Sequence, residues 1–211
     1  MRKLLAAAAF AALPFAVPAA QAQDTGADGA PIETAAATAA PARTAPDGTR
    51  AFGIEPYIGI MGGYERFDRQ SNAGIPIPAN GKAYDGALVQ GVAGINIPLG
   101  PVFVGAEGNV AKGVKGDIDW EYGAAGRFGL RAGESGMIYG KVGYQWVNFD
   151  ALGNNSRDYH AMTYGAGVEV GPKDIGLGGV TGNGGVRLRM EINTFNNAKS
   201  FRPMAGVIAH F

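Results

Sequence analysis

The sequence predicts an all-β fold: an eight-stranded antiparallel up-and-down transmembrane β-barrel. Three observations support this prediction. The chain opens with a segment typical of exported proteins, and its later part alternates between apolar and polar residues over segments of about ten residues. Glycine is also abundant, with 35 among 211 residues, roughly twice the average usage of about 7%. After residue 50 no apolar run approaches the ~18 residues of a membrane-spanning helix.

The first 22 residues have the three parts of a secretory signal peptide. Arg2 and Lys3 carry positive charge, residues 4–17 are mainly apolar, and Ala20-Gln21-Ala22 forms a small-residue cleavage site. A membrane anchor is the alternative, but alanine dominates the apolar run and prolines interrupt it. We therefore expect residues 1–22 to be cleaved from the mature chain.

A linker is expected between the signal peptide and the barrel. Residues 23–50 are rich in Ala, Pro, Thr and Asp, and Ile32 is their only large apolar residue. Such a segment cannot bury enough apolar surface to offset its ordering entropy. We expect a disordered linker at 23–50 and a barrel at 51–211.

Eight segments of the barrel region read as strands, because apolar and polar residues alternate along each of them. The expected strands are 55–67, 83–97, 102–111, 117–130, 137–149, 159–171, 186–195 and 201–211. Eight strands of about ten residues, with their loops, fit the length of 51–211, whereas sixteen would not.

In each expected strand the apolar residues share one face. In the first four strands this face holds Ile58, Ile60 and Tyr64; Val89, Ile95 and Ile97; Val102, Val104 and Val110; and Ile118, Trp120, Tyr122 and Phe128. In the last four it holds Ile138, Val142, Tyr144 and Trp146; Tyr164, Ala166 and Val168; Val186, Leu188, Met190 and Ile192; and Val207 and Ala209. The alternation is strictest in 186–195, where Arg187, Arg189, Glu191 and Asn193 occupy the other face.

Two features favour a barrel in lipid over a soluble sandwich. The polar face consists of glycine with single charges, which suits a narrow and crowded interior better than a solvated surface. The second feature is a group of aromatic residues on the apolar face near one strand end, where a membrane interface would place them. These membrane-interface aromatics are Trp120, Tyr122, Tyr144 and Trp146.

The charged residues of the polar face are expected to meet inside the barrel. The expected lumen charge cluster is Glu107, Asp119, Glu121, Arg127, Lys141, Glu169, Arg187, Arg189 and Glu191. An eight-stranded interior is only wide enough for its own side chains, so a self-compensating ionic core is favoured. A polar conduit for small solutes is the alternative, although the balance of acids and bases argues against a selective pore.

The chain ends in Phe211, which follows an alternating strand with Val207 and Ala209 on one face and Ile208 and His210 on the other. A terminal aromatic residue resembles the signal that the outer-membrane barrel-assembly machinery reads. Ala209 departs from this pattern, because such strands often carry an aromatic residue at that position.

With this ending, the segments 56–64 (PYIGIMGGY) and 164–169 (YGAGVE) resemble the opacity-protein family of small surface antigens, whose barrel is akin to that of outer-membrane protein A. The resemblance covers about 51–211. It implies a barrel in the outer membrane of a Gram-negative bacterium, with both termini in the periplasm. Outer connections would be 68–82, 112–116, 150–158 and 194–200, and periplasmic connections would be 98–101, 131–136 and 172–185.

Composition narrows the functional classes. The 18 basic and 18 acidic residues cancel, so no field favours a nucleic-acid partner. Cysteine is absent, which removes disulfides and thiolate chemistry, and the two histidines are too few and too distant for a metal site. The glycine-rich segment 178–185 lacks the ending of a phosphate-binding loop. We expect no cofactor and no catalytic residue.

Three functional hypotheses follow. The first is a non-enzymatic barrel with a structural or surface-interaction role, whose partners would be outer-membrane lipid, the assembly machinery during insertion and an unknown extracellular molecule. The second is a narrow, passive, porin-like channel for small solutes. The third is a lipid-modifying enzyme at the outer rim, near Ser156, Asp158 and His160. The apolar loop 75–78 (IPIP) would contact a partner or lipid, or fold over the barrel mouth.

Overall fold

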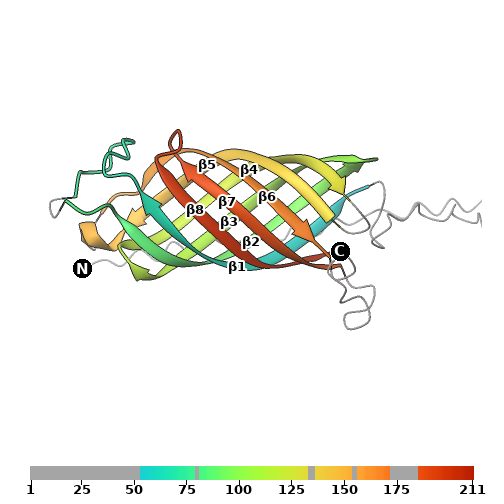
Figure 1. The fold of residues 1–211 in the computed structure, drawn as a ribbon, viewed down its shortest axis with the longest axis horizontal. Coiled ribbons are helices and arrows are strands. Elements are labelled where there is room, and N and C mark those ends of the chain that lie inside the picture. Colours follow the sequence, from blue (N-terminus) through green and yellow to red (C-terminus); the bar gives the residue numbers. More distant parts are fainter. Residues whose placement is uncertain (1–52, 79–80, 133–135, 154–155, 172–184) are drawn as a thin grey trace, which may run out of the picture. The chain divides into compact units, whose positions relative to one another are not determined.

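The computed structural model is a closed barrel of eight antiparallel strands (Figure 1), in which each strand pairs with the next and β8 pairs with β1. It describes residues 53–78, 81–132, 136–153, 156–171 and 185–211. The strands are Glu55–Phe67 (β1), Asp85–Leu99 (β2), Val102–Gly116 (β3), Ile118–Ala132 (β4), Gly136–Phe149 (β5), Tyr159–Val170 (β6), Val186–Phe195 (β7) and Ser200–His210 (β8). A short 3₁₀ helix, η1 (Asp150–Leu152), follows β5.

The barrel has two different ends. The terminal end is where β1 begins and β8 ends, and the distal end carries the connections that follow β1, β3, β5 and β7 (Figure 1). The expected signal peptide (1–22), the linker (23–50) and most of the 172–185 connection lie outside the described residues. In the described part of the chain, no helix is long and apolar enough to cross a membrane.

The hairpins are tighter than the sequence pattern predicts. β2 continues to Leu99, which leaves only Gly100 and Pro101 before β3, and Gly100 adopts the positive φ (77°) that such a turn requires. β3 continues to Gly116, so only Asp117 separates it from β4. The expected outer loop at 112–116 is therefore wrong, because these residues extend the strand.

Two ladders contain a bulge at their distal ends, and the second bulge corrects the expected facing at the start of β4. Val114 on β3 has no partner in the ladder with β2, and Asp119 is an extra residue where β4 pairs with β5. An extra residue reverses the alternation beyond it. Ile118, expected on the apolar outer face, is consequently buried. Asp119, expected in the lumen, instead pairs with Lys112, and its side chain is 26% exposed.

The distribution of polarity is inverted relative to a soluble protein. Every strand exposes large apolar side chains, for example Ile58, Val89, Val104, Phe128, Ile138, Met162, Met190 and Val207. The interior holds most of the buried charged and amide side chains. A closed barrel has no free strand edge, so its backbone polar groups are satisfied within the wall. An apolar outer wall around a polar interior is therefore suited to lipid.

Inward-facing glycines make room for two tyrosine rings, each of which packs over the glycine opposite it on the neighbouring strand. A Cβ atom on Gly94 would lie 2.5 Å from Tyr57 Cζ, and a Cβ on Gly167 would lie 2.5 Å from Tyr139 Cζ. Outward-facing Gly91 differs, because the nearest atom to its Cβ would be the Val110 carbonyl oxygen at 4.0 Å. The glycine content of the lumen wall thus reflects close packing.

Replacing an inward glycine should therefore destabilise the barrel more than replacing an outward one. We expect Gly167→Val to displace Tyr139 and to lower the free energy of unfolding by about 1–3 kcal/mol, the usual cost of overpacking. Gly91→Val should change it by less than about 0.5 kcal/mol. Urea titration of the refolded protein in micelles, followed by tryptophan fluorescence, measures both values. Equal effects would contradict the packing argument.

Candidate functional site

The lumen gathers charged side chains from most strands of the barrel. Eight of the nine residues of the expected lumen charge cluster are buried there: Glu107, Glu121, Arg127, Lys141, Glu169, Arg187, Arg189 and Glu191. Three further buried charges belong with them: Glu55, Glu65 and Arg202. Strand alternation could have predicted that these three side chains face the lumen. Glu55 and Glu65 share the strand face of Met61, and Arg202 shares the face of Met204 and His210.

The central layer of the lumen consists of three bases and three acids: Arg127, Lys141, Arg189, Glu107, Glu169 and Glu191. Arg189 bridges two carboxylates, with Nη1 2.5 Å from Glu107 Oε2 and Nη2 2.7 Å from Glu169 Oε1. Arg127 Nη2 lies 2.7 Å from the same Glu169 oxygen. Because every buried charge here has an oppositely charged partner, the layer compensates its own desolvation.

Lys141 connects the remaining acids of the central layer. Its Nζ lies 2.6 Å from Glu191 Oε1 and 3.1 Å from Glu107 Oε1. The two tyrosines then close the network, because Tyr57 donates to Glu107 Oε2 (2.9 Å) and Tyr139 donates to Glu191 Oε2 (2.6 Å). The carboxylates are thus held by charged and neutral donors together.

The tyrosine rings also pack against the guanidinium groups. Arg127 Cζ lies 3.9 Å from the centre of the Tyr139 ring and 4.9 Å from that of Tyr57, and Arg189 Cζ lies 5.0 Å from the Tyr57 ring. Such contacts favour a cation more when water is excluded. The central layer is therefore filled by side chains that fix one another.

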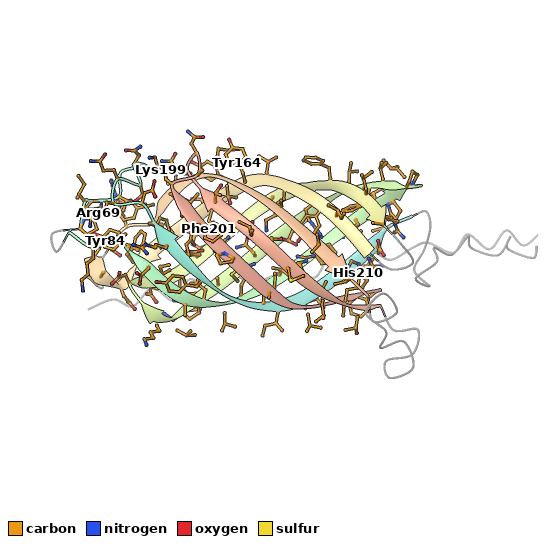
Figure 2. The ribbon with its side chains drawn as sticks, viewed as in Figure 1. Arg69, Tyr84, Tyr164, Lys199, Phe201 and His210 are labelled. Atoms are coloured by element: carbon orange, nitrogen blue, oxygen red, sulfur yellow. The ribbon has the colours of Figure 1, made fainter. Side chains whose placement is uncertain are left out.

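A second ionic layer lies toward the terminal end. Arg131 Nη2 is 3.0 Å from Glu55 Oε2, and Arg187 Nη2 is 3.8 Å from Glu55 Oε1. His210 joins this terminal layer to the central one, since its Nε2 lies 2.8 Å from Glu169 Oε2 and its Nδ1 lies 3.7 Å from Glu55 Oε1. Its label in Figure 2 lies at this end of the barrel.

The distal layer contains two acids and one base. Arg202 Nη1 contacts Glu121 Oε2 directly and lies 3.6 Å from Glu65 Oε2. Gln145 Nε2 donates to the same Glu121 oxygen over 3.3 Å. In contrast to the central layer, acids outnumber bases here.

An apolar cluster, the distal plug, fills the lumen beyond this layer. It consists of Phe67, Ile75, Tyr84, Leu88, Ile118, Val147, Phe149, Tyr159, Ala161 and Phe195. Aromatic rings form its centre, with Phe67 5.1 Å and Tyr84 4.9 Å from Phe149 between ring centroids. Ile75 and Tyr84 come from the β1–β2 connection, and Figure 2 places Tyr84 at the distal end. Burial raises the pKa of the Tyr84 hydroxyl.

The four expected interface aromatics lie on the outer surface of β4 and β5 in their distal parts. Tyr122 and Trp146 are stacked, with ring centroids 5.4 Å apart, and Tyr144 meets Trp146 edge-on at 5.0 Å. Lys112 Nζ lies 4.8 Å above the Trp120 ring. Apolar rings with polar tips near a strand end suit the boundary between lipid and water.

In the hydrogen bonds of the described residues, the three residues considered for catalysis bond to other side chains and not to one another. Ser156 Oγ donates to Asn148 Oδ1, and Asp158 accepts from Tyr122 and Asn148. His160 Nδ1 lies 2.6 Å from the Tyr144 hydroxyl. Since His160 contacts neither the serine nor the aspartate in these bonds, the arrangement lacks the connected nucleophile, base and acid that acyl transfer requires.

The chain end is held by β1. The Phe211 backbone N–H donates to the Pro56 carbonyl oxygen over 2.9 Å, while the Phe211 side chain is 74% exposed. The preceding His210 points inward and stacks on Tyr57 with ring centroids 5.3 Å apart. The terminal aromatic ring is therefore accessible, and its neighbour anchors the strand.

No protein-family profile matches the sequence, and no curated protein matches it. Solved eight-stranded barrels are similar in fold over 75% of this chain. They include the N-terminal β-barrel domain of Pseudomonas aeruginosa OprF (12% identity, 97% of that chain, TM-score 0.46) and Neisserial surface protein A (15%, 99%, 0.44). A third is the attachment invasion locus protein Ail of Yersinia pestis (18%, 97%, 0.42). At these identities the likeness concerns the fold alone.

Proposed function

We propose that this chain is a non-enzymatic barrel of the Gram-negative outer membrane with a structural or surface-interaction role. Its apolar wall would contact lipid, and its terminal end would face the periplasm. The proposal includes export by a signal peptide at 1–22 and recognition of Phe211 by the assembly machinery. It also includes the kinship with opacity-type surface antigens that the sequence suggests.

The filled lumen is the observation that supports a role without transport. The central layer spans the interior with three acids and three bases in contact, and the distal plug adds an apolar barrier at one end. A solute would have to separate ion pairs that are buried away from water, which is costly. The narrow-channel hypothesis is therefore the less favoured one.

The distal connections would then carry the interaction. In the segment 75–78, Ile75 and Pro78 are buried, so part of this loop folds over the barrel mouth. Ile77 between them is 68% exposed, and Pro76 restricts the backbone beside it. This rigidly presented apolar residue at the distal surface would form the contact with a partner.

Planar-bilayer recording of the refolded wild-type protein tests the proposal. We expect no stepwise conductance under conditions in which a known porin inserts and conducts. Migration on gels with and without boiling, measured on outer-membrane extract, checks that the protein is a folded barrel in that membrane. Reproducible unitary currents from the purified protein would instead favour the channel hypothesis.

A further inference from the structure

The distal layer contains an uncompensated buried carboxylate. Glu65 on β1 and Glu121 on β4 share a single cation, Arg202 on β8, and all three side chains are at least 96% buried. Both carboxylates approach the same guanidinium nitrogen, Nη1. If both acids were ionised, the layer would carry a net negative charge in a site that excludes water.

The neighbouring strands offer no second cation. Among the described inward-facing residues at this end, the other amide and hydroxyl side chains of the strands are neutral: Gln90, Asn109, Gln145, Thr163, Asn193 and Ser200. On β7, Glu191 adds a further negative charge toward Arg202. The nearest base on β5, Lys141, is already engaged by Glu107 and Glu191 in the central layer.

The two carboxyl groups lie close together, because each has an oxygen within 3.6 Å of the same Arg202 nitrogen. Two ionised carboxylates are both acceptors, so they can bond only if one of them carries a proton. Glu65 Oε2 and Glu121 Oε1 are buried and accept no hydrogen bond from any other group among the described residues. A proton on the pair would supply the donor that both carboxyl groups lack.

We propose that the Glu65–Glu121 pair is a proton-binding site that holds one proton in the folded barrel at neutral pH, with Arg202 neutralising the remaining charge. The proton belongs to the pair rather than to either residue, as in other closely spaced carboxyl dyads. A proton fits the site better than a metal ion, since the described residues contain no group of three or more His, Cys, Asp or Glu side chains that could hold one.

The proposal has a thermodynamic consequence. Above about pH 5 an unfolded glutamate is ionised, so unfolding releases the proton that the pair held. The folded state then binds one more proton than the unfolded state, and stability falls as pH rises. The pair should make the unfolding constant rise tenfold per pH unit until the proton is lost from the folded barrel. Deprotonation of the pair would leave two ionised carboxylates beside a single guanidinium group beneath the distal plug.

Infrared spectroscopy of the refolded protein tests the proposal directly. We expect a carbonyl band of a protonated carboxyl group at neutral pH in the wild type, and its loss in both Glu65→Gln and Glu121→Gln. Either substitution leaves one ionised carboxylate facing Arg202. Glu107→Gln, in the balanced central layer, should retain the band. A wild-type spectrum without the band at neutral pH would overturn the proposal without reference to any variant.

Urea unfolding gives the second readout. Between about pH 6 and 8, the slope of log unfolding constant against pH should be lower by one in Glu121→Gln than in the wild type. The double variant Glu65→Gln/Glu121→Gln, which leaves Arg202 without a carboxylate, should unfold more readily than either single variant. Equal slopes in wild type and Glu121→Gln, or stability that depends on sodium concentration instead of pH, would contradict a bound proton.

Discussion

Glu169→Gln is expected to cause a large loss of stability among substitutions that preserve side-chain volume. Glu169 accepts from Arg127, Arg189 and His210, so the amide would leave two buried guanidinium groups sharing Glu107. Breaking a buried ion pair by removing one partner costs about 3–5 kcal/mol. Urea unfolding of the refolded barrel measures this cost. The folded fraction is monitored on unboiled gels, as the band that migrates differently from the boiled chain.

An exposed pair provides the matched control. Lys199 Nζ lies 3.5 Å from Asp68 Oδ2 at the distal surface, where the two side chains are 36% and 58% exposed. Asp68→Asn also converts a paired acid into its amide, but solvent screening limits the expected change to about 0–1 kcal/mol. If both substitutions had the same small effect, the central layer would not carry the structural role assigned to it.

Met190→Lys is expected to impair the barrel through its outer wall. Met190 lies on β7, is 54% exposed and has the apolar residues Leu188 and Ile192 beside it on the same face. In water, a lysine there would be harmless. In lipid, a lysine near the bilayer midplane costs about 2–4 kcal/mol. Refolding yield and urea unfolding in lipid vesicles should both decrease.

Ile77→Lys serves as the comparison, since Ile77 is equally apolar and 68% exposed but belongs to a distal connection. A position in contact with water should accept the charge with a change below about 0.5 kcal/mol. A large loss of stability in Met190→Lys beside a small one in Ile77→Lys would show which of the two positions contacts lipid. Tolerance of lysine at position 190 in vesicles would mean that the apolar wall is covered by something other than lipid.

Much of this architecture could be predicted from side-chain alternation. The strands 55–67 and 186–195 coincide with β1 and β7, and the inward placement of Glu107, Arg127 and Glu169 followed from the phase of their strands. These predictions succeeded because a period of two fixes the facing of every residue once one residue is placed.

Side-chain alternation gave the wrong facing or the wrong strand end where the backbone departs from a regular ladder. The bulge at Asp119 shifts the phase by one residue, and nothing in the local composition signals it. Strand lengths were also underestimated at β3, because Lys112 and Lys115 look like loop residues although their strand continues beyond the apolar wall. Pairing partners such as Arg202 with Glu121 join strands distant in sequence, so an isolated sequence could not specify them.

The anchoring of the β1–β2 connection by Ile75 and Tyr84 has a practical consequence. A loop fixed at internal points can lengthen between them without disturbing the wall to which it is attached, since loop-closure entropy grows slowly with length. Foreign peptides inserted between Pro76 and Ile77 should therefore be displayed while Ile75 still occupies the plug. The barrel would then serve as a scaffold for epitope presentation, with the insertion site defined by which residues of the loop are buried.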